Sequence, residues 1–346
     1  MENTRFFIDY KALHTIFILI FALLPSISSA DELNVYSGRK AALIQPLLKQ
    51  FQKETGIKIN LVTAKADALI KRIESEGKST PADILITVDA GRLDRAKKMG
   101  LFHTIDPGSI SPEIPNYYID RDNKWVGLSK RIRTIVYSKN NVNKNDILDF
   151  EDLAKDTWRG RICVRSSNNI YNQSLVASLI ANHGQEKAES IVRKIVSNFA
   201  KNPSGNDRAQ ITAVAKNECD VAIVNHYYYA MMLQSKDAKK RKIANKVDIA
   251  FLNQKDRGAH VNISGIGIMK YSKNIANAEK LIIFLLNKDS QEWYAKVNNE
   301  YPVLEASKVT DLLATWGVLN LDEEIIGKLG SLNPDAVKLM DRVGWQ

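Results

Sequence analysis

Short runs of apolar and β-branched residues alternate along the chain with segments whose apolar residues recur at helical spacing. Segment 42–54 places Leu43, Leu47 and Phe51 on one face of a helix, and segment 185–200 has a similar pattern. Several of the short runs are almost wholly apolar, which is typical of strands buried between two layers of helices. The predicted strands are 33–37, 59–63, 84–88, 134–138, 162–165, 221–225, 247–252 and 265–269.

Strand–helix alternation over roughly 300 residues predicts an α/β fold with mixed, mostly parallel sheets flanked by helices. The chain has 346 residues, enough for about two domains, yet no flexible or low-complexity linker divides it. We therefore expect two lobes joined by strands that cross from one to the other. This arrangement leaves a cleft between the lobes, where ligand sites concentrate.

Residues 1–30 have the pattern of a secretory signal peptide. Arg5 and Lys11 precede an unbroken apolar run at 16–24, and the small residues Ser28 and Ala30 suit cleavage after Ala30. As a helix this run extends only about 14 Å, against about 30 Å for a membrane core, which argues against a membrane anchor. We expect export to an oxidising compartment with no stable membrane insertion.

The chain carries 49 Lys and Arg against 39 Asp and Glu, a formal net charge of +10. This charge favours an anionic partner: nucleic acid, an acidic membrane surface or a small anion. Export removes nucleic acid as the usual partner, and the basic segment 236–242 fits a solvated helix face better than a nucleic-acid contact. The charge alone does not select among the other partners.

The sequence contains no motif that points to an enzyme. It lacks GxSxG, HExxH and Walker motifs, and the glycines at 265 and 267 lie inside a predicted strand without the third glycine of a dinucleotide site. The histidines beyond the leader are scattered and lack metal-ligand spacing. No nucleophile and base pair is visible, so we do not expect catalysis.

Three consecutive tyrosines, 227–229, directly follow the predicted strand 221–225, and Tyr171 follows the predicted strand 162–165. Cys163 precedes Tyr171 by the same interval as Cys219 precedes Tyr227. If the two strands are parallel neighbours, both tyrosine sites lie at the carboxyl edge of one sheet, where open α/β sheets bind ligands, and the cysteines lie close together. Aromatic core packing is the alternative, although successive side chains of a helix point about 100° apart and cannot all be core.

Convergent phenols suit a hard trivalent cation. A phenol has a pKa of about 10, so a strong Lewis acid must displace its proton before it can act as an anionic ligand. Three phenolates would neutralise Fe³⁺, and an octahedral ion would keep sites for an anion. That anion needs a cationic neighbour, for which Arg131, Arg133, Arg39 and Lys40 are the candidates.

At these residues the chain closely resembles the periplasmic ferric-iron-binding proteins of bacterial ABC uptake systems. The resemblance runs from Leu33 almost to the C-terminus. The matching stretches are LNVYSGRK (33–40), FQKETGIKINLV (51–62), PADILITVDAGRL (81–93), WVGLSKRIRTIVYSK (125–139), RGRICVRSSNNIYNQSL (159–175), NDRAQITAVAKNECDVAIVNHYYYAMML (206–233), GAHVNISGIGIMK (258–270) and NEYPV (299–303).

The resemblance implies that Tyr171, Tyr227 and Tyr228 bind the metal and that Tyr229 does not. It also implies that Arg131 lies beside the iron and its synergistic anion. A disulfide between Cys163 and Cys219 is implied in the same way.

Segment 37–42 departs from several members of that family, which add a His and a Tyr, or a Tyr alone, from the first lobe. Here the segment reads SGRKAA, so we expect no direct ligand from the first lobe. This resembles the subclass with three tyrosines and carbonate or bicarbonate as the synergistic anion. Arg39 and Lys40 would face the anion, or else remain solvated surface residues.

The resemblance implies a type II periplasmic-binding-protein fold with a first lobe of 31–130 plus 257–305 and a second of 131–256 plus 306–346. It implies a periplasmic, monomeric component of an ABC transporter that captures Fe³⁺ and delivers it to an inner-membrane permease. The alternative is a binding protein for sulfate, phosphate or an organic acid without metal, using Arg131, Arg133 and the 166–169 loop.

Overall fold

A computed structural model describes residue 2 and residues 31–346 of the chain. The predicted signal peptide, except residue 2, and its cleavage site lie outside the described residues. Within the described residues, no helix is both long and apolar enough to cross a membrane. The strands are β1 (Glu32–Ser37), β2 (Lys58–Thr63), β3 (Ile84–Val88), β4 (Val126–Ser138), β5 (Ile162–Cys163), β6 (Val221–Asn225), β7 (Val247–Ala250), β8 (Ala259–Ile268) and β9 (Leu321–Asp322).

Helices cover both faces of these strands. The α-helices are α2 (Gln45–Thr55), α3 (Ala66–Glu76), α4 (Ala90–Lys98), α5 (Ile170–His183), α6 (Gln185–Ser197), α7 (Asp207–Ala215), α8 (His226–Leu233), α9 (Ala238–Ala244), α10 (Ile275–Leu286), α11 (Lys288–Trp293), α12 (Asp311–Ala314), α13 (Ile326–Leu329) and α14 (Asn333–Arg342). Short 3₁₀ turns are η1 (Ala41–Leu43), η2 (Gly77–Ser79), η3 (Pro107–Ser109), η4 (Asn116–Tyr118), η5 (Lys144–Asp146), η6 (Phe150–Ala154) and η7 (Asp156–Trp158), and η8 (Tyr294–Asn298) is a π-helical turn.

The strands form a mixed sheet in the order β2-β1-β3-β8-β4-β6-β5, with β7 on β4 and β9 on β8. The pairs β1/β2, β1/β3 and β5/β6 are parallel, as expected for α/β lobes. β4 and β8 are antiparallel to each other and to β3, β6 and β7. The two-lobed α/β prediction with mixed sheets is therefore confirmed, but among the described strands antiparallel pairs are as numerous as parallel ones, so the sheets are not mostly parallel.

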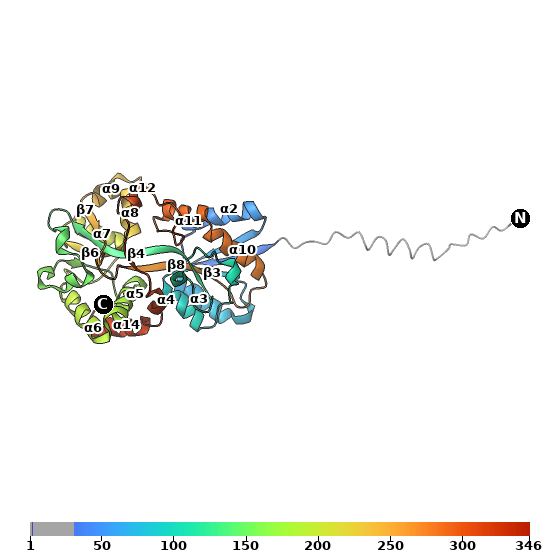
Figure 1. Cartoon of the computed structure of the whole chain (residues 1–346), viewed down its shortest axis with the longest axis horizontal. Helices are drawn as coiled ribbons and strands as arrows, with labels where there is room; N and C mark the ends of the chain where they lie inside the picture. The colour runs from blue at the N-terminus through green and yellow to red at the C-terminus, as the bar shows by residue number, and fades with distance from the viewer. Residues whose placement is uncertain (1, 3–30) are drawn as a thin grey trace. The chain divides into compact units, whose positions relative to one another are not determined.

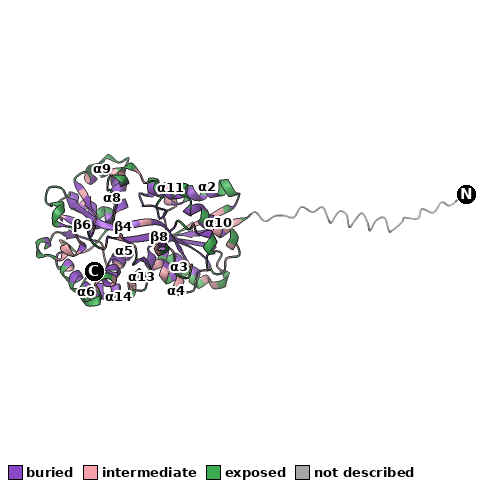
Figure 2. Ribbon diagram, in the orientation of Figure 1, coloured by how far each residue is buried: buried purple, intermediate pink, exposed green. Residues whose placement is uncertain are grey.

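β4 and β8 are the crossing strands. β4 pairs with β8 over Val126–Ile132 and then with β6 over Arg133–Tyr137, so its two halves belong to different lobes. Figure 1 shows both strands running through the middle of the described molecule. Almost every position of β4 is buried, and the strands form the purple interior of Figure 2. These strands fix the two lobes to each other along one seam.

The segment after β9 packs against both lobes. α14 packs on α5, whereas α13 contacts α4 and η4 as well as α5. A Cβ at Gly330 would lie 2.1 Å from the Cβ of Asp94 on α4, so only glycine permits this approach. The C-terminal segment is therefore an additional connection between the lobes.

Cys163 and Cys219 form a disulfide with a Cα–Cα distance of 5.9 Å. Parallel pairing of β5 with β6, which aligns Ile162 with Val221, brings the two cysteines together. Both the expected proximity and the disulfide are confirmed.

Replacing both cysteines with serine is expected to lower the free energy of unfolding by about 2–4 kcal/mol, because the open chain gains entropy when the cross-link is lost. Urea unfolding followed by circular dichroism measures this change. Dithiothreitol should destabilise the parent protein and leave the double variant unaffected. Equal stability of the parent and the variant without reductant would contradict the prediction.

Candidate metal centre

The tyrosines of interest lie at helix starts on one edge of the sheet. β6 ends at Asn225 and α8 begins at His226, so Tyr227 occupies the first turn of α8. Tyr171 occupies the first turn of α5, after the loop that follows β5. Because β5 and β6 are parallel neighbours, both helix starts lie at the same carboxyl edge, as the spacing predicted.

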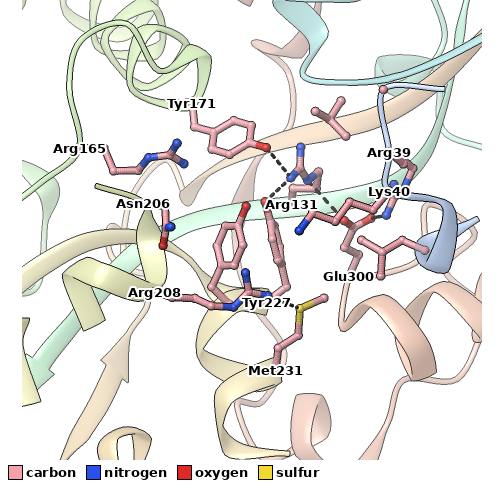
Figure 3. A pocket seen from close by; sticks show the side chains of 14 residues that line it. Arg39, Lys40, Arg131, Arg165, Tyr171, Asn206, Arg208, Tyr227, Met231 and Glu300 are labelled. Atoms are coloured by element: carbon pink, nitrogen blue, oxygen red, sulfur yellow. Dashed lines mark hydrogen bonds and ion pairs between the residues drawn. The ribbon is translucent and has the colours of Figure 1, made fainter. Parts of the chain in front are cut away.

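Tyr171, Tyr227 and Tyr228 line one cavity of about 320 Å³, shown in Figure 3. The first half of the chain supplies its opposite wall. The lining residues are Gly38, Arg39, Lys40, Leu43, Val88, Arg131, Arg165, Tyr171, Asn206, Arg208, Tyr227, Tyr228, Met231 and Glu300. The expected metal- and anion-binding residues lie at this cavity except Arg133 and the 166–169 loop, both of which belong to the metal-free alternative.

Arg131 is the centre of the tyrosine cluster. Its Nη2 donates to Tyr171 Oη at 3.1 Å and also to Tyr227 Oη, and its guanidinium lies 4.8 Å from the centroid of each ring. The rings of Tyr227 and Tyr228 are 4.4 Å apart, and Arg208 lies 4.8 Å from the Tyr228 ring. The phenol oxygens are therefore in a strongly cationic setting.

Tyr229 points away from this cavity. Its hydroxyl donates to the carbonyl of Val247 at 3.0 Å, and its ring stacks on Trp316 at 6.3 Å. The run of three tyrosines thus divides between the cavity and the core, as the angle between successive helical side chains requires.

Burial and Arg131 act in opposite directions on the phenols. Burial raises the pKa of Tyr227 and raises the pKa of Tyr228 to about 12. Burial also opposes ionisation of Tyr171, but the charge and hydrogen bond of Arg131 outweigh it and lower the pKa of that phenol. At neutral pH a bound cation must still displace protons from the buried phenols.

The donor set points to a hard cation. Among the described residues no cluster of three or more His, Cys, Asp or Glu side chains could hold a metal ion. Three phenol oxygens converge at this cavity, and three phenolates match the charge of a trivalent ion.

Glu300 was not anticipated from the sequence, although it lies in the NEYPV stretch. Its side chain is 4% exposed and lies 2.9 Å from Arg39 Nη2 and 3.4 Å from Arg131 Nε. Burial opposes its ionisation, but Arg39, Arg131 and a hydrogen bond from Ser129 lower its pKa. Glu300 is therefore an ionised partner of both arginines. Lys40 lines the same cavity and is exposed.

Arg133 does not line the cavity. Its Nη1 lies 2.7 Å from Asp207 Oδ1, and its Nη2 donates to Asn172. Asp207 is fully buried and also binds Arg165 at 2.5 Å. Arg133 therefore connects α5, which carries Tyr171, to the end of β6 at Asn225, just before Tyr227. This position does not support the expected role of Arg133 as an anion ligand.

His226 connects the start of α8 to the crossing region. Its Nδ1 accepts from the amide of Ile132 at 3.1 Å, and its Nε2 donates to the carbonyl of Asn299 at 2.9 Å. The ring is fully buried, and burial lowers its pKa to about 4. His226 is therefore a neutral structural link beside Tyr227.

Together, the two lobes, the crossing strands and the cavity between them define a solute-binding protein of the periplasmic-binding-protein type. Residues 36–292 match the family of bacterial extracellular solute-binding proteins, and the chain belongs to this family.

Several relatives carry iron in their names. Iron uptake protein A1 of Synechocystis is 42% identical over 91% of this chain and 88% of that protein. The major ferric iron-binding protein of Neisseria gonorrhoeae is 26% identical over 83% of this chain and 85% of that protein. The structure of Trichodesmium IdiA (FutA) in complex with iron and citrate ligands has a TM-score of 0.88 and 43% identity, covering 91% of this chain and all of that one.

We predict that acid removes the stability contributed by neutral His226. Its pKa of about 4 in the folded protein lies below the ordinary value of 6.5, so between these pH values the unfolded chain binds a proton that the folded protein does not. The free energy of unfolding should fall from pH about 6.5 to about 4, by up to about 3 kcal/mol from this residue. Urea unfolding at a series of pH values measures this free energy.

His226→Gln is the comparison, because glutamine keeps one donor and one acceptor but does not titrate. The stability difference between parent and variant should be constant above pH about 6.5 and shrink below it. Parallel pH profiles for the two proteins would contradict the assignment.

Proposed function

We propose that Tyr171, Tyr227 and Tyr228 bind Fe³⁺ in the cavity and that the protein delivers this iron to an inner-membrane ABC permease. The observation that carries the proposal is the convergence of three phenol groups in one cavity, where two of them, Tyr171 and Tyr227, accept hydrogen bonds from the buried Arg131. The iron-named relatives support the same cargo. Three phenolates neutralise Fe³⁺ and leave coordination sites for an anion.

The synergistic anion in this proposal is carbonate or bicarbonate, placed against Arg131 with Arg39 and Lys40 beside it. Arg39 and Lys40 are the polar side chains that segment 37–42 brings to the cavity lining, and the segment has no Tyr or His. The first lobe therefore supplies positive charge and no direct ligand. Citrate, present in the Trichodesmium complex, is the competing anion that an experiment must compare.

The proposed setting is the bacterial periplasm, after cleavage following Ala30, with the protein acting as a monomer. The proposed lobes are 31–130 plus 257–305 and 131–256 plus 306–346, with closure by a hinge motion at the crossing strands. The α13 contact with α4 adds a connection across this division.

Loading the iron-free protein with ferric iron and bicarbonate should produce a reddish phenolate-to-iron charge-transfer band. Tyr171→Phe, Tyr227→Phe and Tyr228→Phe should each weaken ferric binding by at least about 100-fold, because each removes an anionic ligand that water replaces poorly. Visible absorbance titrations with bicarbonate, with citrate and without added anion measure both effects.

Tyr229→Phe is the matched control. It deletes the same hydroxyl from the neighbouring residue, which donates to Val247 and not to the cavity. We expect parental iron binding and a loss of about 1 kcal/mol of stability. A colourless iron-loaded parent, or an equal loss of binding in this control, would contradict the ligand assignment. Binding of sulfate or phosphate without any ferric binding would favour the metal-free alternative.

Acid should release the iron. Protons compete with Fe³⁺ for the phenolates, so ferric affinity should fall as the pH is lowered from about 8 to about 5. Competition with a chelator of known pH-dependent affinity, followed by the charge-transfer band, gives the affinity at each pH. A constant affinity across this range would exclude proton competition.

A further inference from the structure

Glu300 is shared between arginines from two different elements. Arg39 comes from the loop after β1, and Arg131 from the crossing strand β4. Glu300 Oε2 accepts from Arg39 Nη2 at 2.9 Å and from Ser129 Oγ, and Oε1 lies 3.4 Å from Arg131 Nε. Figure 3 shows Glu300 near both arginines, to the right of the tyrosine cluster.

Unused hydrogen-bond donors remain on this arginine pair, chiefly on Arg39. Nε and Nη1 of Arg39 are buried and have no hydrogen-bond partner within the part of the chain that the structure describes, whereas Nε of Arg131 makes no hydrogen bond but faces Glu300 Oε1 at 3.4 Å. Both side chains line the cavity and are about 5% exposed or less. Two buried guanidinium groups, one of them with two free donors, form an attractive site for a small oxyanion, with or without a metal.

We propose that Glu300 prevents this arginine pair from holding an oxyanion on its own and so makes anion capture depend on bound iron. The iron dependence rests on the proposed function. One carboxylate cancels one of the two positive charges, and in a buried site a unit charge changes binding strongly. The weakened pair then retains the anion only when the metal also coordinates it. Glu300 is thus a positioning and charge-setting residue rather than a ligand.

The charge-setting role predicts an effect opposite to that of structural damage. Glu300→Gln keeps the shape of the side chain but removes its charge. Iron-free Glu300→Gln protein should bind sulfate at least about tenfold more tightly than the parent, because both arginines are then uncompensated. Isothermal titration with sodium sulfate, at constant ionic strength set with sodium chloride, measures this affinity. Loss of packing would weaken sulfate binding instead.

Two further variants complete the test. Glu305→Gln makes the same chemical change at an exposed position nearby and should match the parent. Arg39→Gln/Glu300→Gln removes one charge of each sign and also the free donors of Arg39, so it should lose the tenfold gain and bind sulfate no more tightly than the parent. This double variant tests the charge balance even where the single variant fails to fold.

Parental sulfate affinity in folded Glu300→Gln protein would overturn the proposal, as would tight sulfate binding by the parent. Tighter sulfate binding by the double variant than by the parent would also overturn it. No iron is present in these titrations, so their result is independent of the ferric titrations that test the proposed function.

Discussion

The site depends on the burial of one guanidinium, that of Arg131, which is only 5% exposed. An unpaired buried charge costs several kcal/mol, so its partners must be held in place. Tyr171 comes from α5, Tyr227 from α8 and Glu300 from the segment after η8, and each contacts this one group. Two contacts fix these elements to β4. Lys130 and Tyr301 exchange backbone hydrogen bonds, and the His226 ring bonds to the backbones of Ile132 and Asn299. The lobes are thus joined where the charge is buried.

The same constraint explains the composition of β4. Side chains two positions apart share one face of a strand, so Ser129, Arg131 and Arg133 form a polar stripe in an otherwise buried strand. Each member has a polar partner: Ser129 donates to Glu300, Arg131 donates to the phenols and also faces Glu300, and Arg133 pairs with Asp207. A strand that both joins two lobes and carries the cations of a site needs polar residues in its middle, because that is where the cavity lies.

This stripe also limits what the sequence can reveal. Apolar runs located the cores of the main strands, but the prediction for β4 began at 134 because its polar residues interrupt the apolar pattern before that point. The tyrosine sites could be predicted because two strand–helix junctions repeat one spacing with the two cysteines. Glu300 and Asp207 could not, since their roles come from arginines distant in sequence, and a lone acidic residue carries no local pattern. Arg133 appeared equivalent to Arg131 because only the fold shows which partner each one meets.

The charge balance of the cavity follows from these contacts. Three neutral phenols, and three phenolates bound to Fe³⁺, carry the same formal charge, so iron alone does not change the total. Arg39 and Arg131 against Glu300 leave one buried positive charge, which a singly charged anion such as bicarbonate balances. A doubly charged anion needs a further cation, and Lys40 and Arg208 are exposed groups at the cavity that can supply it. The net charge of +10 is therefore far less informative than the few charges that the fold buries.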